Sequence, residues 1–205
     1  TLDQNGNAYV AGSTTSALTT TALDGDKDDS FVAKYDKNGT PVWTQQIKTL
    51  NANQANAISV DSSGNVFIGG QVTGVIGVGQ TNAGKQDAYV AQLDSKGKLV
   101  YEQQMGTVGT DQVSAMATTS DGSLLVASVQ NGHAILSKYA NGDATSAPTG
   151  TQGLGDLQNG CTISSIAVSG NQIYLSGSTT NANLTGGTAT IVTPSSGAGD
   201  AYVMG

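Results

Sequence analysis

The chain repeats itself at a spacing of 58 residues. The segment DQNGNAYVAG at 3–12 returns as DSSGNVFIGG at 61–70. A second segment, DSFVAKYD at 29–36, returns at the same spacing as DAYVAQLD at 87–94. A fixed period of this length is typical of repeat architectures, in which each unit buries its apolar face against the next. The chain is therefore expected to fold as a row of similar units.

One unit, between residues 55 and 104, predicts four short β-strands. The first two are separated by the turn 61–65, where Asp61 can accept local backbone hydrogen bonds and Gly64 tolerates positive φ. A long polar loop separates the second strand from the third. The strands are expected at 57–60, 66–70, 87–94 and 99–104. Four antiparallel strands joined in this way form a blade, and blades repeated around an axis form a β-propeller.

Apolar and aromatic residues recur at equivalent places in these strands. We interpret them as core residues, which are stabilised by burial between sheets, rather than as a stripe for stacking bases or sugars. The second strand offers Tyr9, Phe67, Leu125 and Tyr174; the third offers Phe31, Tyr89, Ile135 and Tyr202; the fourth offers Trp43 and Tyr101.

The predicted fold class is an all-β, partial β-propeller of about three and a half blades. Thr1 and Leu2 are expected to end an inner strand, and Gly205 to lie within a third strand. Propellers usually close with four to eight blades, so we expect a single propeller region that is a fragment of a longer one. The blades are expected at about 1–50, 51–108, 109–158 and 159–205.

The third unit departs from the period. Gly64 and Gly122 keep the spacing of 58, but Gly97 and Gly142 are only 45 apart. The contraction is expected in the loop between the second and third strands, shortened to about 130–132. His133 then occupies the position of Asp29, Asp87 and Asp200 in the other units. We interpret it as a polar residue that begins a strand rather than as a ligand or a base.

Composition excludes several classes of protein. Charged residues make up 11% of the chain, Arg is absent, and Glu102 is the one Glu, so helix is disfavoured. A net charge of −7 with scattered Lys argues against a nucleic-acid partner. No apolar run approaches the roughly 20 residues of a membrane span. Cys161 alone cannot form an intrachain disulfide, and we interpret it as an idle thiol rather than a nucleophile.

The two repeated motifs together resemble the bacterial SBBP beta-propeller repeat. The resemblance is strong over the first two units and looser after Gln130. It implies a structural scaffold in a secreted, surface-attached or flagellum-associated bacterial protein, and it carries over no catalytic residues.

Propeller geometry places the short turns on one face, among them the turns between third and fourth strands at Gly39, Gly97 and Gly142. The loops between second and third strands lie on the other face. The latter loops, 13–28, 71–86 and 181–199, are long, polar and different in each unit. Variable loops on a rigid scaffold commonly carry binding sites, so we predict that this face binds a protein partner. A glycan-binding propeller is the alternative. It would require an aromatic residue with Asp or Asn in each loop, and loops 71–86 and 181–199 contain no aromatic residue.

Alternating carboxylates at Asp24, Asp26 and Asp28 form a candidate calcium site, because a hard cation prefers six to eight oxygen ligands. The loop is not an EF-hand, since Asp29 stands where that motif needs Gly and Tyr35 where it needs Glu. The alternative is a solvated acidic loop that leads into the strand at Asp29.

No enzyme signature is found. His133 and Cys161 lie apart, without the pattern of a nucleophilic triad, and a chain without Arg cannot clamp a carboxylate as sialidase-type propellers do. Most Asp residues fall at repeated turns rather than as a pair for glycoside hydrolysis. We therefore predict a non-enzymatic extracellular or cell-surface scaffold with no catalytic residues and no cofactor beyond the possible calcium ion.

Overall fold

The computed structural model describes residues 1–18, 28–49, 51–156, 162–180 and the backbone of 200–204. Within these ranges the chain is all-β, with fourteen strands and one single-turn 3-10 helix, η1 (Ala140–Gly142). The predicted all-β fold class is confirmed. No helix long and apolar enough to cross a membrane is found in the part of the chain that the structure describes.

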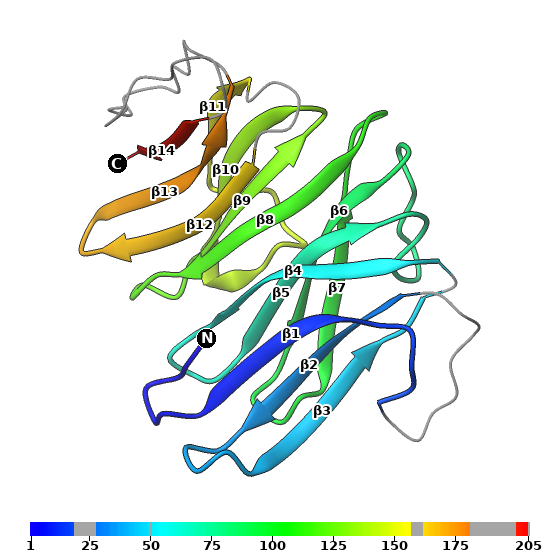
Figure 1. Ribbon diagram of the computed structural model, residues 1–205, viewed down its shortest axis with the longest axis vertical. Helices are drawn as coiled ribbons and strands as arrows, with labels where there is room; N and C mark the ends of the chain where they lie inside the picture. The colour runs from blue at the N-terminus through cyan, green and yellow to red at the C-terminus, as the bar shows by residue number, and fades with distance from the viewer. Residues whose placement is uncertain (19–27, 50, 157–161, 181–199, 205) are drawn as a thin grey trace.

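The strands form four antiparallel sheets, and in each sheet the strands follow one another in chain order (Figure 1). The first sheet contains β1 (Ala8–Thr14), β2 (Asp29–Tyr35) and β3 (Pro41–Ile47). The second contains β4 (Asn53–Val60), β5 (Val66–Val72), β6 (Asp87–Leu93) and β7 (Leu99–Met105). The third contains β8 (Asp111–Thr118), β9 (Leu124–Gln130), β10 (His133–Tyr139) and β11 (Gly150–Asp156). The fourth contains β12 (Thr162–Ser169), β13 (Gln172–Thr179) and β14 (Asp200–Met204).

Consecutive sheets pack against one another, and each of the three interfaces has its own hydrophobic core. Tyr9 and Val32 of the first sheet pack with Ile68 and Tyr89 of the second. The second interface combines, among others, Phe67, Val90, Val113 and Val126. The third combines Ala127, Leu154, Ile163 and Leu175. Strands β4, β8 and β12, which open their sheets, lie side by side along one line of the molecule. Burial between sheets therefore holds the row of units together.

The repeated turns are built as the sequence predicts. The carboxylate of Asp61 accepts hydrogen bonds from Ser63 N at 2.8 Å and Asn65 N at 2.9 Å. Gly64 has φ +81, which suits glycine, and its N–H donates to Asp61 O. The same arrangement recurs at Asp3, Asp36 and Asp94. Local side-chain chemistry therefore fixes these hairpins.

Several expectations need correction. Tyr174 is not a core residue: its side chain is 37% exposed, because no described sheet packs on it. The connection around Gly142 is not a short turn, since β10 ends at Tyr139 and β11 begins at Gly150. The first strand of the second unit begins at Asn53, earlier than the apolar run at 57–60 indicates. The contracted loop is confirmed as a tight hairpin between β9 and β10, and His133 begins β10 with an exposed side chain.

Aromatic residues of β3 and β7, the last strands of the first two sheets, bond each of these sheets to the next one. Trp43 Nε1 donates to Ser95 O at 3.3 Å, and Tyr101 Oη donates to Gly142 O at 2.6 Å. Burial raises the pKa of Tyr101 to about 12. The neutral phenol is therefore the form that the folded protein favours, and the stability it contributes is complete below pH about 10, the ordinary pKa.

We expect the free energy of unfolding to fall above pH about 10, because Tyr101 ionises there in the unfolded chain and only near pH 12 in the folded protein. The buried Tyr89, whose pKa burial also raises, contributes to the same fall. Tyr101→Phe should lower stability by about 1 kcal/mol at pH 8, because it removes the hydrogen bonds to Gly142 O and from Ala144 N, and should make this alkaline slope shallower. Urea unfolding at several pH values measures both effects. The exposed Tyr174 provides the control variant Tyr174→Phe; an unchanged slope in Tyr101→Phe would contradict the prediction.

Candidate functional site

The two ends of the sheets differ: long connections lie at one end and short hairpins at the other. The loop between β5 and β6 (73–86) and the connection between β7 and β8 (106–110) lie at one end of the second sheet, because antiparallel strands alternate in direction. We call this the loop end. The Asp-Gly hairpins around Gly64 and Gly97 lie at the opposite, turn end. Residues 19–27 and 181–199 of the other predicted long loops lie outside the described residues.

Loop 73–86 is held by Gln104, a buried residue of β7. Its side-chain amide donates to Gly74 O at 2.8 Å and to Asp87 Oδ2 at 2.7 Å, and its oxygen accepts from Ile76 N at 3.0 Å. Asp87 Oδ2 also accepts from Ala83 N at 2.8 Å. Both sides of the loop are therefore bonded to one buried pair of side chains.

The same anchor exists in the first unit. Gln46, 58 residues before Gln104, donates to Asp29 Oδ2 at 3.1 Å and accepts from Leu18 N at 3.0 Å. Asp29 and Asp87 were predicted as strand-start residues. Both side chains are buried, and each carboxylate accepts a hydrogen bond from the glutamine side chain of its own unit. The first two units therefore share the same hydrogen-bonded Gln–Asp pair, which fixes the long loop to its sheet.

The anchored loop presents exposed apolar side chains. Val78 is fully exposed, and Val75 is 40% exposed on the same loop. Val108, in the adjoining connection, is 84% exposed. The two segments are bonded to each other, since Lys85 N donates to Gly109 O at 3.1 Å and Asp111 N to Gln86 O at 2.8 Å. The two joined segments therefore offer apolar side chains to another molecule at this end of the sheet.

Glu102 lies beneath this loop, on β7. A Cβ placed on Gly77 would be 2.6 Å from Glu102 Oε2, so glycine permits this close approach. Burial raises the pKa of the Glu102 carboxyl. The loop therefore covers an acidic group as well as the Gln104 anchor.

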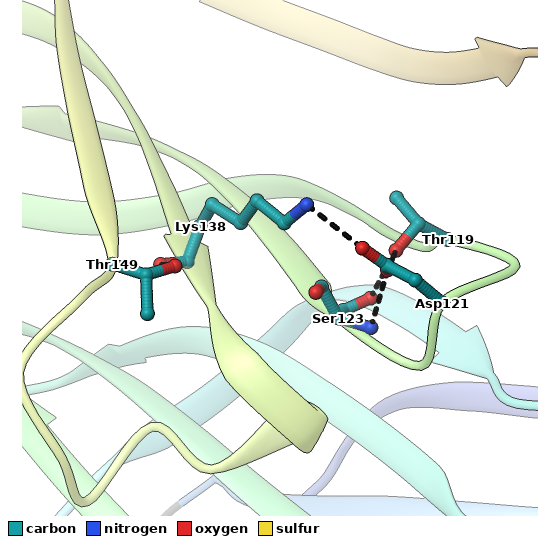
Figure 2. A network of polar contacts seen from close by, with 5 residues as sticks. All are labelled: Thr119, Asp121, Ser123, Lys138 and Thr149. Carbon is teal, nitrogen blue, oxygen red and sulfur yellow. Dashed lines mark hydrogen bonds and ion pairs between the residues drawn. The ribbon is translucent and has the colours of Figure 1, made fainter. Parts of the chain in front are cut away.

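Two small hollows lie at the turn end of the part of the chain that the structure describes. The larger, of about 260 Å³, lies between the third and fourth sheets and is lined by residues that include Thr119, Asp121, Leu125, Lys138 and Ile173. Lys138 Nζ pairs with Asp121 Oδ2 at 3.0 Å, and Asp121 Oδ1 accepts from Ser123 N at 3.0 Å and from the Thr119 hydroxyl (Figure 2). The Thr119 hydroxyl, Ser123 N–H and Lys138 lower the pKa of Asp121.

Thr149 lies beside the backbone of Lys138 (Figure 2) and donates its N–H to Lys138 O at 2.8 Å. Both members of the Lys138–Asp121 pair are substantially exposed, so the pair adds little to stability. Its charges cancel, which leaves the hollow without a net attraction for an anion or a cation.

The second hollow, of about 210 Å³, occupies the equivalent place between the first two sheets, with Asp3, Tyr9, Lys34 and Asp61 in its lining. Tyr9 donates to Asp3 Oδ2 at 3.1 Å, and Lys34 Nζ lies 5.0 Å from the Tyr9 ring centre. Partial desolvation raises the pKa of Asp3, but the hydrogen bonds from Asn7, Asn5 and Tyr9 together lower it. The Tyr9 ring is buried and therefore offers no stacking platform for a sugar.

The candidate calcium ligands are only partly described. Asp24 and Asp26 lie outside the described residues, as does Cys161. Asp28 Oδ2 accepts from Gln54 Nε2 at 3.0 Å, so its carboxylate helps to position β4. Among the described residues no group of three or more His, Cys, Asp or Glu side chains is arranged to hold a metal ion. The calcium site at Asp24, Asp26 and Asp28 stays a prediction.

Gln46 and Gln104 are the residues that the sequence reasoning missed. A signal was present, because the Gln-Gln pair at 45–46 returns at 103–104 with the period of the repeat. Polar residues at a strand end carry no hydrophobic periodicity, so only the repeat spacing could have identified them.

The chain is similar in sequence to a bacterial regulatory protein and in structure to a solved enzyme. No family model matches the chain. The regulatory protein FlaEY of Caulobacter vibrioides is 28% identical over 207 residues, which cover 85% of this chain and 21% of that protein. The chain therefore spans about a fifth of the length of this relative. A solved structure of a luciferin-regenerating enzyme is 13% identical with a TM-score of 0.49, over 99% of this chain and 59% of the other.

Proposed function

We propose that the protein is a non-enzymatic, extracellular or cell-surface β-propeller that binds a protein partner through its loop end. The observation that carries the proposal is the anchored loop 73–86, which presents the exposed Val78, together with the adjoining connection 106–110, which presents the exposed Val108. An ordered loop loses little conformational freedom on binding, and apolar side chains at its surface gain from desolvation.

Two further observations support a propeller. Each sheet is an antiparallel meander, and the opening strands β4, β8 and β12 lie side by side, as the inner strands of consecutive blades do. Sheets packed in this order leave their unlike loops together at one end. The repeated motifs that resemble the SBBP repeat agree with this arrangement.

A place at a flagellum or another surface appendage is part of the same proposal. The similarity to FlaEY of Caulobacter vibrioides and the resemblance to the SBBP repeat both support it. A protein partner is favoured over a glycan because the exposed side chains of loop 73–86 include Val75 and Val78 but no aromatic residue, and glycan sites usually rely on aromatic platforms with polar neighbours.

We expect the double substitution Val78→Asp and Val108→Asp to abolish partner binding while the melting temperature stays within about 2 °C of wild type, since both side chains are exposed. The full-length protein is purified with its partners from its native host after in-cell crosslinking, and the co-purified proteins are quantified. Lys98→Asp, a charge change at the turn end, is the control and should retain them. An identical set of partners in the double variant would contradict the proposal.

A further inference from the structure

The first two units differ by one side chain in the buried polar cluster of the loop end. The first contains Asp29 and Asn53; the second contains Asp87 and, at the position of Asn53, Asp111. All four side chains are buried, and Asp87 and Asp111 have no exposed surface at all. The second unit therefore places two carboxylates where the first has a carboxylate and an amide.

In the first unit both oxygens of the Asp29 carboxylate have donors. Asn53 Nδ2 and Thr49 N each donate to Asp29 Oδ1 at 3.4 Å, and Gln46 donates to Oδ2. An amide can donate in this way, whereas an ionised carboxylate only accepts.

The second unit has lost both donors to Oδ1. Asp111 cannot replace the Asn53 amide, and Thr107, the counterpart of Thr49, donates its N–H to Asp111 Oδ2 at 2.6 Å instead. Asp87 Oδ1 is buried and has no hydrogen-bond partner. A buried carboxylate oxygen without a donor or a positive charge is strongly unfavourable.

The orphaned oxygen lies against the segment that holds the second carboxylate. A Cβ on Gly106 would overlap Asp87 Oδ1, so this oxygen lies against residue 106, directly before the Thr107 that holds Asp111. Asp111 N also donates to Gln86 O at 2.8 Å, next to Asp87 in the chain. The two carboxylates therefore border one small region between β6 and β8.

We propose that this region binds a hard divalent cation, with Asp87 Oδ1 and the Asp111 carboxylate as its charged ligands. Two carboxylates neutralise a divalent ion, and the Thr107 hydroxyl, at 3.0 Å and 3.1 Å from the Asp111 oxygens, supplies a further oxygen. Calcium suits the site better than magnesium, because calcium accepts irregular sets of protein oxygens and magnesium gives up its water reluctantly.

The ion would act at the loop end. Asp87 also binds Gln104 and Ala83 N, which fix loop 73–86, and Asp111 accepts from Asn131 N at 2.9 Å in the third unit. Cation binding therefore stabilises the presenting loop and the contact between the second and third sheets together.

The test measures the melting temperature and calcium binding of the full chain after chelation, at constant ionic strength, with calcium, magnesium or sodium chloride added. Calcium at one hundred times its dissociation constant should raise the melting temperature by roughly 5 °C or more. Isothermal titration calorimetry should show that Asp111→Asn binds one calcium ion fewer than wild type. This variant restores the amide of Asn53, so it should melt no lower than chelated wild type.

Matched variants separate this site from the acidic loop. Asp26→Ala should keep the calcium response, whereas Asp87→Asn should remove it, which provides a second test if Asp111→Asn does not fold. The proposal is overturned if no cation raises the melting temperature of wild type, or if Asp111→Asn or Asp87→Asn responds to calcium as wild type does. It is also overturned if lowering the pH, with no cation added, raises the melting temperature as much as calcium does.

Discussion

Gly70→Ala should destabilise the protein by about 3 kcal/mol or more, which is among the largest effects expected of a single methyl group. Gly70 pairs with Ala55 at a register shift between β4 and β5. A Cβ there would overlap the carbonyl oxygen of Gln54 and lie 2.8 Å from its carbonyl carbon. These are backbone atoms of β4, so they cannot rotate away as a side chain can.

The repeat itself supplies the control. Gly12 is the equivalent of Gly70, and a Cβ there would meet only the Phe31 ring, at 3.1 Å. Gly12→Ala should therefore cost less than about 1.5 kcal/mol. Gly153→Ala meets nothing within 4 Å and should be nearly neutral. Urea unfolding of the three variants measures the series; equal losses at Gly70 and Gly12 would show that the close approach of β4 is not what selects glycine.

The sequence predicted the features that are determined locally or by the period. The hairpins at Asp3, Asp36, Asp61 and Asp94 depend on a side chain that bonds its own turn, so neighbouring residues suffice to identify them. The contracted hairpin at 131–132 was equally readable, because deleting residues from a repeat leaves a measurable change of spacing.

Features that depend on partners from distant parts of the chain were not predictable. The strand β4 begins at the polar Asn53, which is buried because its side-chain oxygen accepts from Ser30 N at 2.8 Å. Hydrophobic periodicity detects apolar burial and cannot reveal a polar residue that a remote backbone group satisfies. Tyr174 shows the converse: its aromatic position repeats, yet burial also requires a neighbouring sheet.

The candidate site was predicted in outline only. Loop 71–86 was correctly identified as long, and the structure adds that it is anchored and exposes Val78. The anchor could not be derived from residue type, because a glutamine on an outer strand normally faces solvent. Gln103 and Gln104 are adjacent, and only the register of β7 determines that Gln104 is the buried one.

Gln104→Ala should lower the free energy of unfolding by about 2–4 kcal/mol and release loop 73–86. The substitution removes three hydrogen bonds, to Gly74 O, Ile76 N and Asp87 Oδ2, and leaves the buried Asp87 carboxylate with one donor fewer. Hydrogen exchange should accelerate at Ile76 N, whose acceptor is lost, and at Ala83 N, whose acceptor Asp87 is no longer fixed.

Gln103→Ala is the matched control, because Gln103 is only half-buried and donates to Gln80 Oε1 at 3.3 Å and to Gln104 O at 2.8 Å. It should cost less than about 1 kcal/mol and leave exchange at Ile76 unchanged. In the crosslinking experiment, Gln104→Ala should weaken partner capture although Val78 and Val108 are intact, because a released loop must be ordered again on binding. Faster exchange with undiminished capture would mean that the fixed geometry of the loop is unnecessary for recognition, and that the apolar side chains suffice.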